Sequence, residues 1–122
     1  MSDSRITSEQ GLKLLAQVRE ICMRYPEVAE QIDDFGHTSF RVRDKPFIMM
    51  GEGSGQATIN FKLLHETQDF LIQTGRFTKS AYIGQHGWTV LDPGGKIDWE
   101  EVEDLIDEAY RRTAPKTLIK KL

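Results

Sequence analysis

The chain has 122 residues, a size at which one domain buries a core without disulfides or metals, and we expect a single domain over residues 1–122. Its one cysteine, Cys22, excludes an intramolecular disulfide and favours a reducing compartment, so the cytoplasm is the expected location. The net charge of −3 argues against a histone-like polyanion binder, and no run approaches the ~20 apolar residues of a membrane span, so no membrane partner is expected.

The first predicted helix starts at a capping box formed by Thr7 and Gln10. Apolar residues then recur at helical spacing, at Leu15, Val18, Cys22 and Tyr25. Because Pro26 disfavours the helical conformation in the residue before it, the helix is expected to end at Tyr25.

Alternating patterns after this helix predict strands. Residues 40–44 and 47–50 are expected to form a hairpin, in which Arg41 and Arg43 point away from the side that Phe40 and Val42 face. The glycine-rich run 51–55 looks like a phosphate-binding loop, but a strand at 57–63 follows it instead of a helix. We therefore predict a hairpin loop there.

A shorter helix is predicted over residues 64–74, with Leu64, Phe70 and Leu71 toward the core, and Gly75 closes it. Strands at 79–83 and 88–91 follow, joined by a turn at 84–87.

The last helix begins at Asp98, with Glu101 in the reciprocal capping position. It carries an apolar stripe to Tyr110 and stops before Pro115. The core is expected to span about residues 7–112, with a frayed tail at 113–122.

The connections are too short for parallel crossovers, so the sequence predicts an α+β fold. We expect a twisted, mainly antiparallel sheet with three helices gathered largely on one face. Ten side chains are predicted to be largely buried: Phe40, Val42, Phe47, Phe61, Phe70, Tyr82, Trp88, Val102, Leu105 and Ile106.

Several segments form an ordered set: the run Phe35–Phe40, Lys45 with Phe47, the run Phe61–Leu63, Ala81–Gly84, Gly87-Trp88 and a last helix ending near Tyr110. Together they resemble the MmcQ/YjbR-like family of small bacterial proteins. The resemblance covers about residues 26–110. It implies a compact α+β domain with a twisted antiparallel sheet, and members are commonly labelled DNA-binding.

The sequence carries no catalytic signature. His37, His65 and His86 lack the spacing of metal ligands, and no serine or Cys22 lies in a nucleophile motif. Neither an enzyme activity nor a metal or other cofactor is expected, and the three histidines are interpreted as turn or surface residues.

Two binding functions are predicted. The first is weak, sequence-independent DNA binding through a basic strand face, formed by Arg41, Arg43, Lys45, Lys62, Arg76 and Lys79. The alternative is a protein or small-molecule partner that binds in a groove beside Tyr82, His86 and Trp88. The acidic run at 98–108 is interpreted as a solvated helix face.

Overall fold

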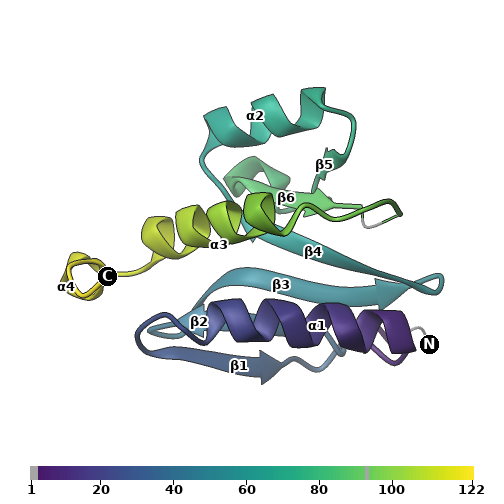
Figure 1. The fold of residues 1–122 in the computed structure, drawn as a ribbon, viewed down its shortest axis with the longest axis horizontal. Coiled ribbons are helices and arrows are strands. Elements are labelled where there is room, and N and C mark those ends of the chain that lie inside the picture. The colour runs from purple at the N-terminus through teal and green to yellow at the C-terminus, as the bar shows by residue number, and fades with distance from the viewer. Residues whose placement is uncertain (1–2, 93) are drawn as a thin grey trace.

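The computed structural model describes residues 3–92 and 94–122, and it has one sheet of six antiparallel strands in the order β1-β2-β3-β4-β6-β5 (Figure 1). In chain order the elements are α1 (Glu9–Cys22), β1 (Val28–Ile32), β2 (Thr38–Val42), β3 (Lys45–Gly53), β4 (Gln56–Lys62), α2 (His65–Gln73), β5 (Phe77–Lys79), the 3-10 turn η1 (Gly84–His86), β6 (Trp88–Leu91), α3 (Trp99–Thr113) and α4 (Lys116–Ile119). Helices α1 and α3 cover one face of the sheet, and α2 packs beside β5. The predicted α+β fold is confirmed.

The core lies between the sheet and helices α1 and α3. In β4, Ala57, Ile59 and Phe61 face these helices and are buried, while the residues between them point to the other face. A β-bulge interrupts the pairing of β2 with β3. Phe40 lies opposite Ile48 and Arg41 opposite Pro46, so Phe47 is the extra residue in β3. The bulge lets two consecutive side chains, Phe47 and Ile48, enter the core.

The first helix is shorter than expected. Ser8, not Thr7, is its N-cap, and the Ser8 hydroxyl accepts a hydrogen bond from the Gly11 N–H. Tyr25 lies beyond the helix end, where its hydroxyl donates to Asp107 and its ring lies 4.7 Å from that of Tyr110. The apolar spacing that includes Tyr25 therefore reflects packing by a loop residue rather than a further helical turn.

The sequence-based analysis did not predict two of the elements. The edge strand β1 has the sequence Val-Ala-Glu-Gln-Ile, in which apolar and polar residues alternate little. Among the described residues this strand pairs only with β2, and most of its side chains are exposed, so its sequence is not constrained to alternate. The expected frayed tail is also wrong. Residues Lys116–Ile119 form α4, and Leu118 is only 1% exposed in the core. None of the helices in the described ranges is long and apolar enough to cross a membrane.

Eight of the ten predicted core residues are buried, but Phe70 and Tyr82 are 67% and 95% exposed. Phe70 points to solvent because Gln68 and Leu71 form the inner side of α2. The buried Gln68 amide donates to the carbonyls of Gly84 and Trp88. The predicted strand at 79–83 ends at Lys79, and a turn then carries Tyr82 outward.

Candidate functional site

The sheet face opposite α1 and α3 is called the helix-free face below. Strand alternation and register place Ser39, Arg41, Met49, Thr58, Asn60, Lys62 and Val90 on it. Their neighbours in sequence, such as Phe40, Ile59 and Phe61, are buried on the helix side. This face carries part of the predicted basic set.

Arg41 and Arg43 do not share a face, which corrects the sequence-based expectation. Strand β2 ends at Val42, and Arg43 and Asp44 form a turn with φ values of 51° and 66°. The Nε and Nη2 of Arg43 donate to the two carboxylate oxygens of Glu27 at 2.7 and 3.1 Å. Arg41 lies on the helix-free face, but it donates to the Ser39 hydroxyl and to the Asp44 carbonyl. Both guanidinium groups are thus already engaged.

Arg76 and Lys79 lie away from the other predicted cations. Arg76 precedes β5, donates to Glu101 of α3 at 2.8 Å and lies over the Phe77 ring. Lys79 ends the edge strand β5, at the far side of the sheet from β2. The six predicted residues therefore split into separate groups.

Lys45 and Lys62 belong to a larger group that the sequence-based analysis did not identify. Strand β3 starts and β4 ends at the end of the molecule where α4 lies (Figure 1). Burial lowers the pKa of Lys62, and the positive charges of Arg112 and Lys45 lower it further. Lys121 lies close enough to Glu27 to reinforce the lowering of the Glu27 pKa by Arg43. Cations from β3, β4, α3 and α4 thus converge.

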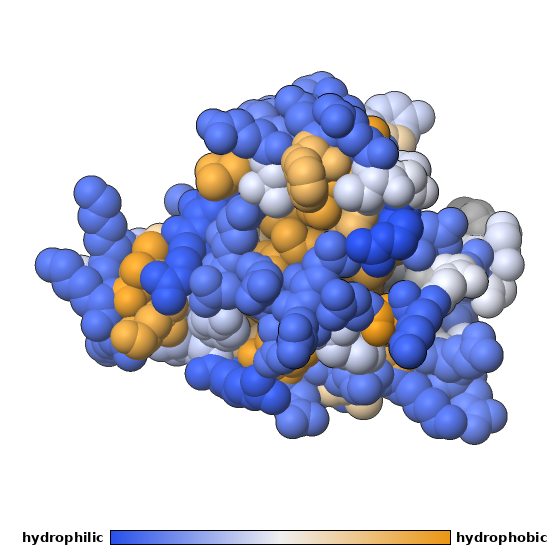
Figure 2. Space-filling view, turned by 45° about the horizontal axis from the view of Figure 1, so that its top comes forward, coloured by the Kyte–Doolittle hydropathy of each residue, from blue (hydrophilic) through white to orange (hydrophobic). Residues whose placement is uncertain are grey.

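We call this group the basic end and define it as Lys45, Lys62, Arg112, Lys116, Lys120 and Lys121. Within residues 3–92 and 94–122, none of the six forms an ion pair, whereas Arg43, Arg76 and Arg111 do. Arg112 donates instead to the carbonyls of Leu63 and His86. Figure 2 shows hydrophilic side chains projecting from this end of the molecule around an apolar patch.

The acids nearest to this end have partners of their own. Asp107 accepts hydrogen bonds from the Tyr25 hydroxyl and from Arg111, at 2.9 and 2.8 Å. Glu108 accepts from the Leu64 N–H and the Thr67 hydroxyl. The other acids of the 98–108 run lie in the earlier turns of α3 or just before them, farther from α4 (Figure 1). The six cations of the basic end therefore have no ion-pair partner among the described residues.

In the part of the chain that the structure describes, Tyr82, His86 and Trp88 do not line one groove together, which corrects the sequence-based expectation. Trp88 is only 6% exposed, and His86 is a surface residue of η1. A hollow of about 620 Å³ lies instead on the helix-free face, and Tyr82 is the one residue of the three that lines it. We call it the sheet groove; its lining includes His37, Met49, Thr58, Asn60, Ser80, Tyr82 and Val90.

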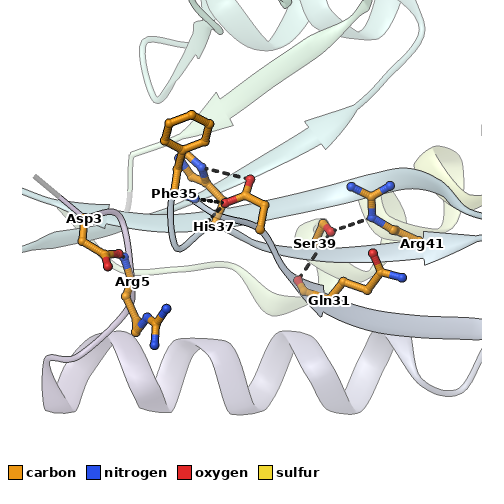
Figure 3. A network of polar contacts seen from close by, with 8 residues as sticks. Asp3, Arg5, Gln31, Phe35, His37, Ser39 and Arg41 are labelled. Carbon is orange, nitrogen blue, oxygen red and sulfur yellow. Dashed lines mark hydrogen bonds and ion pairs between the residues drawn. The ribbon is translucent and has the colours of Figure 1, made fainter.

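A hydrogen-bonded loop between β1 and β2 holds His37 at one side of the sheet groove. The Asp33 carboxylate accepts from the Phe35 and His37 N–H groups, each at 2.9 Å, and lies 3.4 Å from the His37 Nδ1. Although burial opposes the change, these hydrogen bonds lower the pKa of Asp33. Figure 3 shows the rings of Phe35 and His37 and the Arg41 guanidinium on the side of the strands away from α1.

The histidines and acids do not build a metal centre in the part of the chain that the structure describes. No group of three His, Cys, Asp or Glu side chains there could hold an ion. Cys22 is buried in the core, and burial raises the pKa of its thiol.

The sequence contains weak signals for the residues that the sequence-based prediction missed. Leu118 and Ile119 interrupt the lysine-rich tail, as expected of one apolar turn against a core. Asn60 lies between Thr58 and Lys62 in a strand whose alternate residues are apolar, so its position on the helix-free face could be predicted. The walls of the sheet groove come from distant loops, which no local pattern predicts.

Comparisons with known proteins agree with this fold. No curated protein matches the sequence. The crystal structure of the Deinococcus radiodurans protein DR2400, which has a DUF419 domain, is similar with a TM-score of 0.70 and 16% identity, over 79% of this chain and 75% of that chain. A family model described as YjbR matches residues 23–112, from the end of α1 almost to the end of α3. Because that span is most of the molecule, and contains every strand of the sheet, the chain belongs to the YjbR family.

Proposed function

We propose that the protein is a non-enzymatic, nucleic-acid-binding protein that contacts the phosphate backbone through its basic end. The observation that carries the proposal is the gathering of six cations, from β3, β4, α3, α4 and the residues that follow α4, without an ion-pair partner among the residues described. Phosphate contacts by lysine and arginine supply most of the sequence-independent affinity for nucleic acid.

The location of the charges also supports this function. Like charges that lie close together repel one another: burial is the main cause that lowers the pKa of Lys62, and the nearby charges of Arg112 and Lys45 lower it further. A bound phosphate relieves that repulsion, so binding is favoured without any rearrangement of the fold. The acidic first turn of α3 lies nearer the middle of the molecule, at the end of this helix away from α4.

Salt dependence gives the sharpest test. If about four of the six cations contact phosphates, the slope of log affinity against log salt on duplex DNA should be roughly −3.6. Fluorescence anisotropy with a short labelled duplex at several salt concentrations measures it. Replacing Lys116, Lys120 and Lys121 together with alanine should make the slope shallower by up to about 2.7.

A matched control removes the same charge elsewhere. Arg5, Lys79 and Lys96 are exposed, and no ion pair to them occurs within the described ranges. Their triple alanine variant should keep the slope of the unmodified protein within about half a unit, because these residues make no phosphate contact. Absence of binding at low salt, or equal losses in the two triple variants, contradicts the proposal.

The arginines on which the sequence-based hypothesis rested have a smaller part in this proposal. Arg43 is paired with Glu27 through two hydrogen bonds, and Arg41 is held by Ser39 and Asp44. Moving either guanidinium to a phosphate breaks existing hydrogen bonds. Arg43→Ala should therefore change the salt slope less than Lys62→Ala does.

A further inference from the structure

We propose that the sheet groove binds an uncharged planar heterocycle that carries an N–H donor next to an acceptor, the chemistry of a nucleobase. The groove is a different surface from the lysines of α4, and the inference holds whether or not the basic end binds nucleic acid. Such a ring can come from a free nucleoside or from an unpaired base in a strand. The residues that recognise it are Asn60, Ser80, Met49, Val90 and Tyr82.

The floor of the groove is a row of side chains across three strands. Met49 of β3 is the register partner of Asn60 of β4, which in turn is the partner of Val90 of β6. Neighbouring strands lie about 4.8 Å apart, so the row spans roughly 10 Å, about the length of a fused two-ring heterocycle. Apolar groups flank one central amide, which suits a flat ring with a polar edge.

Asn60 and Ser80 provide the hydrogen-bonding groups for the polar edge of the ligand. The Asn60 Nδ2 donates to the Ser80 hydroxyl oxygen at 3.1 Å, which leaves the hydroxyl hydrogen of Ser80 free to donate. The Asn60 Oδ1 is buried and has no hydrogen-bond partner within residues 3–92 and 94–122. An acceptor and a donor therefore lie side by side, and a buried unpaired oxygen gains from any donor that reaches it. Because this oxygen is closed to solvent in the empty groove, the Asn60 side chain has to turn toward the groove when that donor enters the floor.

The rim supplies an aromatic ring. Tyr82 is 95% exposed and has a φ of 66°, an unusual conformation for a residue with a side chain. A fully exposed tyrosine beside a hollow is placed to stack on a planar ligand, and the Met49 side chain on the floor offers a sulfur contact.

The charges that line the groove disfavour an anionic ligand on its floor. Glu52 is the acid that lines the groove, and its carboxylate accepts from the Thr7 and Ser8 N–H groups and from the Ser8 hydroxyl. Among the residues that the structure describes, no lysine or arginine lines the groove. Lys62 lies two residues from Asn60 on the same strand face, about 7 Å along β4, so a phosphate attached to the bound ring meets positive charge just outside.

The test is a titration with the four common nucleosides, followed in ¹H–¹⁵N NMR spectra that include the Asn60 side-chain amide. We expect one or more nucleosides to shift this amide and the backbone amides of residues 80–83. Asn60→Ala and Tyr82→Gly should each weaken that binding about 10-fold or more, because one removes the hydrogen-bonding edge and the other the stacking ring. Glycine adopts the Tyr82 backbone conformation without strain, so folding is preserved.

Thr78→Ala is the matched control, since Thr78 is exposed on β5 beside Val90 but does not line the groove. It should leave nucleoside binding unchanged. A single-stranded oligonucleotide compared with an abasic strand of equal length distinguishes the two sources of the ring. If the strand provides it, the abasic strand binds more weakly and Asn60→Ala removes the difference.

The inference is overturned if neither nucleoside binding nor the effect of the abasic strand depends on Asn60. If nucleosides bind but oligonucleotides show no salt-dependent binding, the function proposed for the basic end is contradicted. The inference about the sheet groove is then still supported.

Discussion

Replacing Leu118 with alanine tests whether α4 is a fixed part of the fold. Leu118 is 1% exposed and belongs to the hydrophobic core, although α4 spans only Lys116–Ile119. Full burial of a leucine side chain is worth about 1.5–3 kcal/mol, and the cavity left behind raises Leu→Ala losses to about 2–5 kcal/mol. Because α4 lies at the end of the chain and can move into the space, we expect the lower part of that range, about 2–3 kcal/mol.

Urea denaturation measures this loss, and thermal unfolding should show a decrease of roughly 10 °C in Tm for a domain of this size. Leu122→Ala is the matched control, because Leu122 is the same residue type in the same segment but is 48% exposed. Its effect should stay within about 0.5 kcal/mol. A loss below about 0.5 kcal/mol for Leu118→Ala would show that α4 is detached in solution, and the lysines of the basic end would then have no fixed position.

Three further predictions follow from other parts of the structure. Trp88→Ala should reduce the free energy of unfolding by about 3–5 kcal/mol in urea melts, since this large side chain is buried; a loss below about 1 kcal/mol would contradict its burial. The hydroxyl of Ser8 and the N–H groups of Thr7 and Ser8 lower the pKa of Glu52 to about 2. The ionised carboxylate therefore stabilises the fold at pH values above its unfolded pKa, and this stabilisation is lost as the pH falls through about 2. The stability difference between the unmodified protein and Glu52→Gln should therefore be largest above about pH 5 and shrink toward pH 2, and equal pH profiles in urea melts would refute the assignment. Cys22 should be alkylated by iodoacetamide at mildly alkaline pH only in denaturant, since burial raises the pKa of its thiol and blocks access; rapid alkylation of the native protein would refute this.

Local patterns predicted the sheet better than the sides of the helices. The alternation of apolar residues in β4 assigned Ile59 and Phe61 to the core because a strand has a period of two and leaves no choice of face. In α2, Phe70 and Leu71 are consecutive, and helical periodicity alone does not decide which of them turns inward. The buried Gln68 decides it, because its amide bonds two carbonyls of the η1–β6 region and brings Leu71, three residues later, to the inner side.

The candidate site was predictable only in part, because it depends on where strands end and on contacts between distant segments. Alternation correctly placed Arg41 on the helix-free face, but it failed at Arg43, where the strand has already turned. The lysines in and just after α4 reach the basic end through the burial of Leu118, a tertiary contact that composition does not reveal. Tyr82 was predicted to lie beside a groove, and it does, but the groove floor is formed by strands β3, β4 and β6.

The separation of charge along the molecule gives it a permanent dipole moment. The six cations of the basic end, which have no ion-pair partner among the described residues, lie near α4, and the acids Asp98, Glu100 and Glu101 lie at the start of α3, near the middle of the molecule (Figure 1). In the field of a polyanion, such a molecule experiences a torque before it makes contact, and it approaches with α4 leading. The effect fades at separations beyond about 10 Å in 0.1 M salt. Orientation during approach should therefore raise the association rate at low ionic strength more than it slows dissociation.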